Sequence, residues 1–315
     1  MHRTRCRILV LASLPILGVG VVACGDDDGT ASGGTGDGLR VVASFYPLAE
    51  AAGRVGGDRV AVTNLTPAGT EPHDLELTPD QVDDLEDADL VLYLGQGFQP
   101  AITEIAERRD GETLDVLDGL ELEPGGAEAL DAQEGEHEEG GLDPHFWLDP
   151  RRMVDAVDEI ATALSAVSPD DAATFAANAE DYAGQLTALD AEIEAALATC
   201  EREEIVTSHA AFFYLADRYG LTQLPLAGVS PEVEPDTERM DDLADLVDEH
   251  GITTVFHETL APPDVAETLA REAGVDTAVL NPIEGLTEEQ VDTGEDYASV
   301  MRENLAALVD ALGCE

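Results

Sequence analysis

A long stretch in the middle of the chain, between Ser168 and Thr199, most constrains the fold. Ser168 and Pro169 are typical of a helix start, and the residues after them include one glycine, no further proline and many Ala and Leu. This composition predicts one helix of about 30 residues, roughly 45 Å long at 1.5 Å per residue. A helix of that length is a rigid strut, so we expect residues 169–199 to connect two lobes and to allow little hinge motion.

Short apolar strands alternate with helical segments on both sides of this stretch. Strand followed by helix and strand at this spacing is typical of parallel βαβ units. We therefore predict an α/β fold with two parallel-sheet lobes, at residues 39–168 and 200–315. The expected strands lie at 40–44, 60–65 and 89–94 in the first lobe and at 204–207, 252–257 and 276–280 in the second.

The first 38 residues carry the signals of an exported protein. Three arginines precede a short apolar run, which is typical of a signal peptide and too short for a stable membrane span. Small residues then lead to Cys24, in a pattern that resembles a lipoprotein signal-peptidase site. The resemblance implies removal of residues 1–23, lipid on Cys24 and a flexible tether over residues 24–38. An ordinary secretory peptide cut nearby is the alternative.

Two cysteines remain after such processing, Cys200 and Cys314, because Cys6 leaves with the signal peptide and Cys24 takes the lipid. Outside the cytoplasm, two remaining cysteines most often pair. A Cys200–Cys314 disulfide would tie the last residues to the start of the second lobe. Neither cysteine lies near a histidine in the sequence, so we do not count them as metal ligands.

The charge balance is extremely acidic, with 68 Asp and Glu against 15 Arg, no Lys and a formal net charge of −53. Such a surface repels nucleic acid and anionic lipid, so we exclude both as partners. We interpret the acidity as a device for solubility or for a salty habitat, and it does not argue for a metal site. Residues 123–141 form a Gly- and Glu-rich segment that we predict to be a mobile acidic surface loop. His137 in this loop either collects cations or is a chance histidine.

Three histidines and one carboxylate lie at the ends of predicted elements. His73, His145 and Glu284 fall in loops, and His209 follows a predicted strand. Ligands of parallel α/β sheets bind outside the carboxyl ends of the strands. Three imidazoles and one carboxylate suit tetrahedral Zn²⁺, whereas Mn²⁺ favours more oxygen ligands. Each histidine alone would be interpreted as structural, but together they predict a zinc site in the cleft between the lobes.

Four motifs in order along the chain resemble those of a known family. They resemble the cluster A-I metal-binding lipoproteins of zinc and manganese ABC importers, over about residues 39–313. The resemblance implies two lobes joined by a long helix, a buried metal between them and delivery of that metal to a membrane permease. The motifs are Glu71-Pro-His73-Asp74, Asp143-Pro-His145-Phe-Trp-Leu-Asp149-Pro150, Thr207-Ser-His209-Ala-Ala-Phe212 and Leu280-Asn-Pro-Ile-Glu284-Gly285.

The resemblance also implies the ligand set. His73, His145 and His209 match the zinc-uptake branch, because manganese members usually carry Glu where His209 stands. The fourth ligand of the family is often an Asp directly after the last strand, where this chain has Asn281. Some zinc members use a Glu three residues later, so we predict Glu284 as the fourth ligand.

Four further residues are predicted as supporting groups or alternative ligands. They are Asn281, Asp143, Glu258 and His257. The last two follow each other near the end of a predicted strand. A metal-bound histidine usually needs a carboxylate or carbonyl partner, which makes Glu258 a candidate for that role. His250, at the end of an acidic helix, is interpreted as a surface residue that suits a helix C-terminus.

The leading functional hypothesis is a monomeric, lipid-anchored protein on the extracytoplasmic face of the cell membrane. It would capture Zn²⁺ with high affinity and deliver it to an ABC permease. A manganese-importing homologue and a metal-binding surface adhesin are the alternatives. An enzyme would need an open coordination position beside a general base. No His-Glu-x-x-His motif occurs in the sequence, so we expect no catalytic residues.

Overall fold

The computed structural model describes residues 38–73, 75–122, 142–229, 231 and 235–315. Cys24, His137 and the acidic loop at 123–141 lie outside the described residues, so the predictions made for them stay predictions. Within the described part of the chain, no helix is both long enough and apolar enough to cross a membrane.

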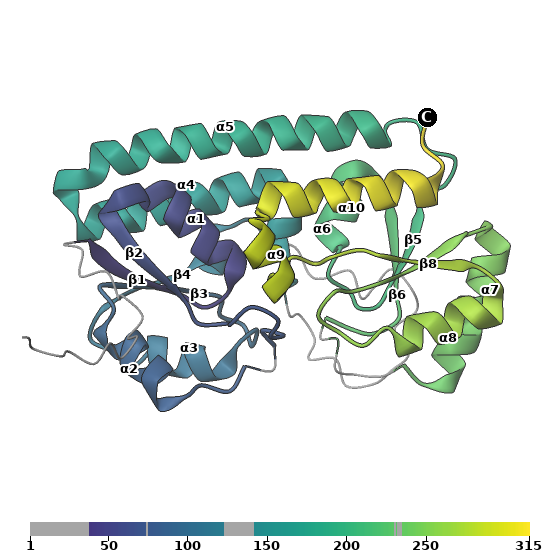
Figure 1. Cartoon of the computed structure of the whole chain (residues 1–315), viewed down its shortest axis with the longest axis horizontal. Helices are drawn as coiled ribbons and strands as arrows, with labels where there is room; N and C mark the ends of the chain where they lie inside the picture. Colours follow the sequence, from purple (N-terminus) through teal and green to yellow (C-terminus); the bar gives the residue numbers. More distant parts are fainter. Residues whose placement is uncertain (1–37, 74, 123–141, 230, 232–234) are drawn as a thin grey trace, which may run out of the picture. The chain divides into compact units, whose positions relative to one another are not determined.

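The first lobe is a parallel four-stranded sheet in the order β2-β1-β3-β4 (Figure 1). All four residues of β3 are buried, as expected for a strand covered on both faces. Helix α1 lies on one side of the sheet and α2 and α3 lie on the other. The elements are β1 (Leu39–Ala43), α1 (Tyr46–Gly56), β2 (Val60–Asn64), α2 (Pro79–Asp87), β3 (Leu90–Tyr93), α3 (Pro100–Ala106) and β4 (Glu112–Asp115).

The second lobe repeats this topology, with the strand order β6-β5-β7-β8. In both sheets the first strand along the chain lies between the second and the third, and every pair is parallel. The prediction of two parallel-sheet lobes is therefore confirmed. The elements are β5 (Glu204–Thr207), α6 (Phe213–Tyr219), β6 (Thr222–Pro225), α7 (Thr237–His250), β7 (Thr254–His257), α8 (Asp264–Ala273), β8 (Asp276–Val279), α9 (Glu288–Thr293) and α10 (Tyr297–Leu312).

Two long helices, α4 (Pro150–Val167) and α5 (Ala172–Leu197), belong to the helical layers on one side of the sheets: α4 packs on the first sheet, and α5 lies outermost, above α1, α4 and α10 (Figure 1). Helix α5 packs against α4 and α1 at the first lobe and against α10 at the second. With 26 residues it is about 39 Å long, shorter than predicted. The reason is that Pro169–Asp171 forms a 3₁₀ turn before the helix begins.

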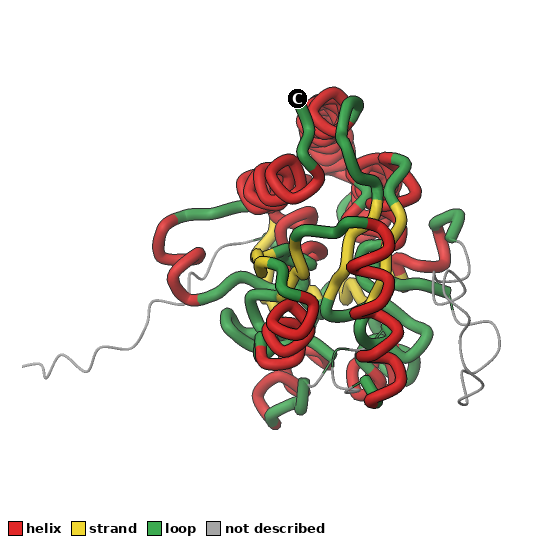
Figure 2. Tube along the Cα trace, turned by 90° about the vertical axis from the view of Figure 1, so that its right-hand side faces the viewer, coloured by secondary structure: helices red, strands yellow, loops and turns green. Residues whose placement is uncertain are grey.

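One continuous hydrophobic core joins the helix layer to both sheets. It includes Val41 and Leu92 of the first sheet, Leu186 of α5, and Ile205 and Phe256 of the second sheet. In the view along the long axis, strands lie inside and helices lie outside them (Figure 2). A close-packed core that spans both lobes resists their separation, which supports the prediction of little hinge motion.

The predicted disulfide is present between Cys200 and Cys314. It joins Cys314, the second residue after α10, to the turn before β5. The backbone amides of Glu201 and Arg202 also donate to the carbonyl of Leu312. The chain end is thereby fixed to the start of the second lobe, as the sequence predicts.

Candidate metal centre

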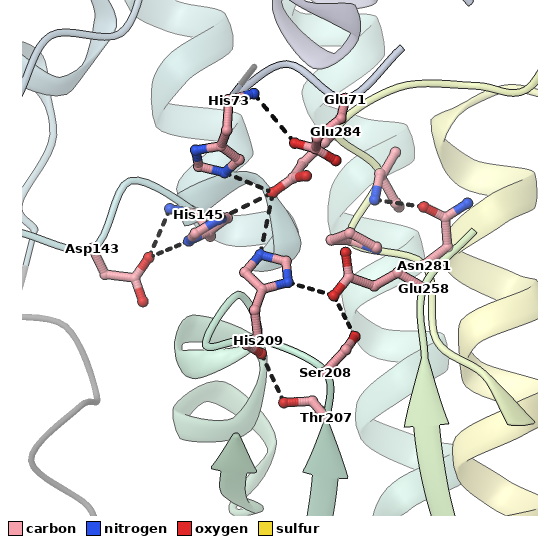
Figure 3. Close-up of polar contacts among 12 residues, drawn as sticks. Glu71, His73, Asp143, His145, Thr207, Ser208, His209, Glu258, Asn281 and Glu284 are labelled. Carbon is pink, nitrogen blue, oxygen red and sulfur yellow. Dashed lines mark hydrogen bonds and ion pairs between the residues drawn. The ribbon is translucent and has the colours of Figure 1, made fainter. Parts of the chain in front are cut away.

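The structure brings His73, His145, His209 and Glu284 together, and each offers one ligand atom within 4.8 Å of the others. His73 lies in the loop after β2, and His209 is the second residue after β5 (Figure 3). Glu284 lies in the loop after β8, and His145 precedes the 3₁₀ turn that leads into α4. Three of the four side chains thus follow the carboxyl end of a parallel strand. Two come from each lobe.

The segment of His145 is fixed from the second lobe. Its neighbour Trp147 is fully buried, and the indole Nε1 donates to the carbonyl of Pro282 at 2.7 Å. The hydroxyl of Tyr297 donates to the Trp147 carbonyl at 2.5 Å. The imidazole of His145 packs on the indole, with 5.1 Å between ring centroids. These contacts fix the position of His145 relative to the loop that carries Glu284.

Three imidazole nitrogens surround one carboxylate oxygen of Glu284. Its Oε1 lies 3.1 Å from Nε2 of His145 and 3.4 Å from Nε2 of both His73 and His209. Zinc bonds of about 2.0–2.1 Å in a tetrahedron give donor-to-donor distances of about 3.3 Å. The spacing of these donors and their chemistry therefore fit a tetrahedral zinc ion.

Two of the histidines have a carboxylate on the opposite ring nitrogen. Asp143 Oδ1 lies 2.7 Å from Nδ1 of His145, and Glu258 Oε1 lies 2.5 Å from Nδ1 of His209. The hydroxyl of Ser208 donates to the same oxygen of Glu258. In the neutral ring, a carboxylate that accepts from Nδ1 fixes the tautomer with a free lone pair on Nε2, the atom that faces the cluster. The arrangement prepares both imidazoles to bind a metal.

The cluster is removed from water, and its charges shift the acidity of its members. Burial is the largest single influence on His209 and lowers its pKa, but the carboxylates of Glu258 and Glu284 together outweigh burial and raise this pKa to about 10. Burial likewise lowers the pKa of His145, and the combined effect of Asp143 and Glu284 leaves it raised. These carboxylates stabilise positive charge at the imidazoles, whether a proton or a metal ion supplies it.

The carboxyl of Glu284 is acidic for a buried group. Burial would raise its pKa, but hydrogen bonds from His145, His209 and His73 hold the pKa well below its usual range. Glu71 shows the opposite behaviour, because burial and the nearby Glu284 charge raise its pKa to about 9. The two carboxyls are therefore inequivalent. Glu284 is the one held as an anion by the histidines.

A strained turn presents Glu284. Ile283 has a φ of 55°, a left-handed conformation that is unfavourable for a β-branched residue. The side-chain oxygen of Asn281 accepts from the Ile283 amide at 2.8 Å. Asn304 pairs with the backbone of Asn281, accepting from its amide at 2.8 Å and donating to its carbonyl at 2.7 Å. The structure thus places the Asn281 oxygen on the turn, and its role there is to hold the backbone.

The remaining candidates lie outside the cluster or at its edge. His257 is half-buried, and its Nδ1 bonds the carbonyl of Glu258 at 3.2 Å. His250 ends α7, where its Nδ1 lies 2.9 Å from a carboxylate oxygen of Glu204. The sequence reasoning missed Glu71, whose Oε1 accepts from the amide of His73 at 3.2 Å. Its position two residues before His73 was the available signal.

Comparison with known proteins identifies relatives of the whole described chain. The profile of the family described as zinc-uptake complex component A periplasmic matches residues 41–311. The zinc-binding lipoprotein AdcA of Streptococcus pneumoniae serotype 4 is 39% identical over 279 residues, or 86% of this chain and 55% of that protein. This chain thus spans about half the length of that relative. The high-affinity zinc uptake system protein ZnuA of Bacillus subtilis is 36% identical over 302 residues, or 93% of each protein.

Solved structures of related zinc- and metal-binding proteins also resemble this chain. The Zn(II)-bound ZnuA-like domain of Streptococcus pneumoniae AdcA matches with a TM-score of 0.73 and 37% identity, over 87% of this chain and 99% of that domain. The laminin-binding protein Lmb of Streptococcus agalactiae, described as a bifunctional protein with adhesin and metal transporting activity, has a TM-score of 0.75. It is 26% identical over 87% of this chain and 100% of that one. The chain therefore belongs to the family described as zinc-uptake complex component A periplasmic.

Proposed function

We propose that this protein captures Zn²⁺ outside the cytoplasm and delivers it to an ABC permease in the cell membrane. One observation carries the proposal: the Nε2 atoms of His73, His145 and His209 lie 3.1–3.4 Å from a single oxygen of Glu284. These four residues are the proposed zinc ligands. Asp143 and Glu258 orient two of the imidazoles and balance the charge of the ion.

Zinc fits this ligand set better than manganese. Three imidazole nitrogens and one carboxylate are typical zinc donors, whereas Mn²⁺ favours carboxylate, carbonyl and water oxygens. With four protein ligands, no coordination position is left for a water that the metal could activate. The proposed site therefore binds and releases zinc and is not catalytic.

The family and the N-terminal sequence support a proposal for the cellular setting. The relatives are named as a zinc-binding lipoprotein and as part of a zinc uptake system. Cleavage before Cys24 and lipid on its sulfur would place a monomeric protein on the outer face of the cytoplasmic membrane, beside its permease. Residues 24–38 would then serve as the tether between the lipid and the first lobe.

Native mass spectrometry tests the proposal directly. The purified protein is stripped of metal and exposed to equal Zn²⁺ and Mn²⁺. We expect one tightly bound zinc, which the His209→Ala variant loses. The control is His250→Ala, because His250 lies outside the cluster at the end of α7. Absence of bound metal, or several loosely held ions in both variants, would mean that the four residues do not form a site.

Adhesion is a second candidate, favoured by the similarity to the laminin-binding protein Lmb. It predicts that the purified protein binds immobilised laminin. The measurement is made with zinc-loaded wild type and with His209→Ala. Binding by neither protein removes adhesion as a function and leaves zinc capture unaffected.

A further inference from the structure

Three carboxylates meet beside the histidine cluster, on the side away from His145. Glu71, Glu258 and Glu284 each offer an oxygen within 4.8 Å of the others. Glu71 comes from the first lobe, and the other two come from the second. The side chains of Glu258 and Glu284 are each only 1% exposed. Figure 3 shows Glu71 and Glu284 facing each other and Glu258 extending toward them from the loop after β7.

Each of these carboxylates uses one oxygen and leaves the other unpaired. Oε1 of Glu71 accepts from the His73 amide, Oε1 of Glu258 accepts from His209, and Oε1 of Glu284 faces the three imidazoles. The Oε2 atoms of all three are buried, and the described residues provide them with no hydrogen-bond donor except the Glu71 carboxyl itself, which bonds Glu284 when it is protonated. Buried carboxylate oxygens without partners are costly unless a cation neutralises them.

One zinc ion does not satisfy all three groups. Zinc in the proposed position contacts Glu284 through Oε1, which leaves the Oε2 side of the cluster without a positive partner. The chain also contains no lysine that could supply one. An all-oxygen set of carboxylates is what hard divalent cations such as Mn²⁺, Mg²⁺ and Ca²⁺ prefer.

We propose that Glu71, Glu258 and Glu284 form a second cation position, which adjoins the zinc position and takes a hard divalent cation. Glu284 bridges the two positions, with Oε1 toward the histidines and Oε2 toward the second cation. The inference rests on the proposed function in one respect, namely that zinc occupies the histidine side. Because Glu71 and the other two carboxylates belong to different lobes, the second cation ties the lobes together over the bound zinc.

The test titrates Mn²⁺ into the zinc-loaded purified protein in high salt, which screens the exposed carboxylates. Free Mn²⁺ is measured by electron paramagnetic resonance, and bound zinc is measured by elemental analysis of the same samples. We expect one Mn²⁺ to bind per protein while one zinc is retained. The second cation should also slow the transfer of zinc to a chelator.

The Glu71→Gln variant tests the position and not the zinc site. Glutamine keeps an oxygen that can accept from the His73 amide, but it cannot release a proton and become an anion when a cation binds. Mn²⁺ affinity should fall by at least about 10-fold, because one of three carboxylate ligands is lost, and one zinc should remain bound. The matched control is Glu76→Gln, an exposed carboxylate in the same loop, which should leave Mn²⁺ binding unchanged.

Three results would overturn the inference. Mn²⁺ does not bind, or it binds equally to wild type and to Glu71→Gln, or it displaces the zinc ion for ion. In each case a retained single zinc before titration leaves the proposed function standing. If zinc itself fails to bind, the proposed function and this inference fall together.

Discussion

The two lobes have the same sheet topology, but they build their parts of the proposed metal centre differently. In the first lobe, the carboxylate that orients His145 is Asp143, only two residues away. In the second lobe, the carboxylate that orients His209 is Glu258, which is 49 residues away at the end of another strand. The first lobe therefore relies on a local segment, and the second relies on the correct pairing of its strands. The same metal-binding chemistry arises from local sequence in one half and from tertiary structure in the other.

The largest expected effect comes from removing one histidine from either lobe. His145→Ala and His209→Ala should each weaken zinc binding by several orders of magnitude, well beyond the roughly 10- to 100-fold typical of a lost supporting group. Affinity is measured by competition with a chelator of known strength. Equal losses would show that the lobes contribute equally. Unchanged affinity in either variant would remove that histidine from the site.

The disulfide gives the second lobe a covalent constraint, and the described residues of the first lobe contain none. Replacing Cys200 and Cys314 by serine should lower the free energy of unfolding by about 2–5 kcal/mol, because the bond closes a long loop. Denaturant unfolding of zinc-free protein measures the loss. Zinc affinity should stay near that of wild type, since neither residue contacts the cluster. A large loss of affinity instead would mean that the second lobe needs the bond to align its strands.

The supporting carboxylates test the difference between local and remote construction. Asp143→Asn and Glu258→Gln should each reduce zinc affinity by about 10- to 100-fold, because the imidazole loses an anionic partner on Nδ1. The measurement is again chelator competition, with circular dichroism to show that the fold is retained. Comparable losses would mean that the partner's place in the sequence is irrelevant. A much smaller effect of Glu258→Gln would show that Ser208 and the strand ends already fix His209.

The smallest expected effect is on stability, and it comes from a turn in the first lobe. Like the turn before Glu284, this turn contains a non-glycine residue with a positive φ, but it has no part in the proposed zinc site. Gln96 has a φ of 54° in an exposed turn after β3. Gln96→Gly should raise the free energy of unfolding by at most about 1 kcal/mol, since relief of roughly 1–2 kcal/mol of backbone strain is partly offset by the entropy of glycine. Zinc affinity should not change. Destabilisation would show that the Gln96 side chain stabilises the folded state although it is exposed.

The sequence predicted the fold where apolar strands are central and helix starts are marked. The strand expected at 204–207 appears with those bounds, and the helix start expected after Ser168 appears as the turn Pro169–Asp171 followed by α5. It did not predict β4 and β6, because Glu112–Asp115 and Thr222–Pro225 are short, partly polar edge strands without a clear period. Helix α6 begins at Phe213, four residues after His209, and the hydroxyl of Thr207 donates to the carbonyl of His209 in the turn before it.

The four proposed ligands could be named from motifs, because each stands in a short recognisable stretch. Their partners were harder to name. Asn281 was considered as a ligand, and only the structure shows its oxygen on the amide of Ile283. Glu71 stands two residues before His73, but its convergence with Glu258 and Glu284 from the other lobe becomes visible only in the structure. These contacts form where the ends of several strands meet, and the strands come from distant parts of the sequence, so no single motif contains the information.

The unequal burial of the four proposed ligands has a kinetic consequence. His145 and His209 are fully enclosed and Glu284 is 1% exposed, but the His73 side chain is 10% exposed. His73 also sits on a loop between β2 and α2, outside the core that binds the lobes together. Loops of this kind open locally at lower free energy than packed cores. Zinc release would therefore begin with local opening of the His73 loop, which moves one imidazole away from the ion while the other three ligands stay in place. The rate of this opening would limit the rate of zinc transfer.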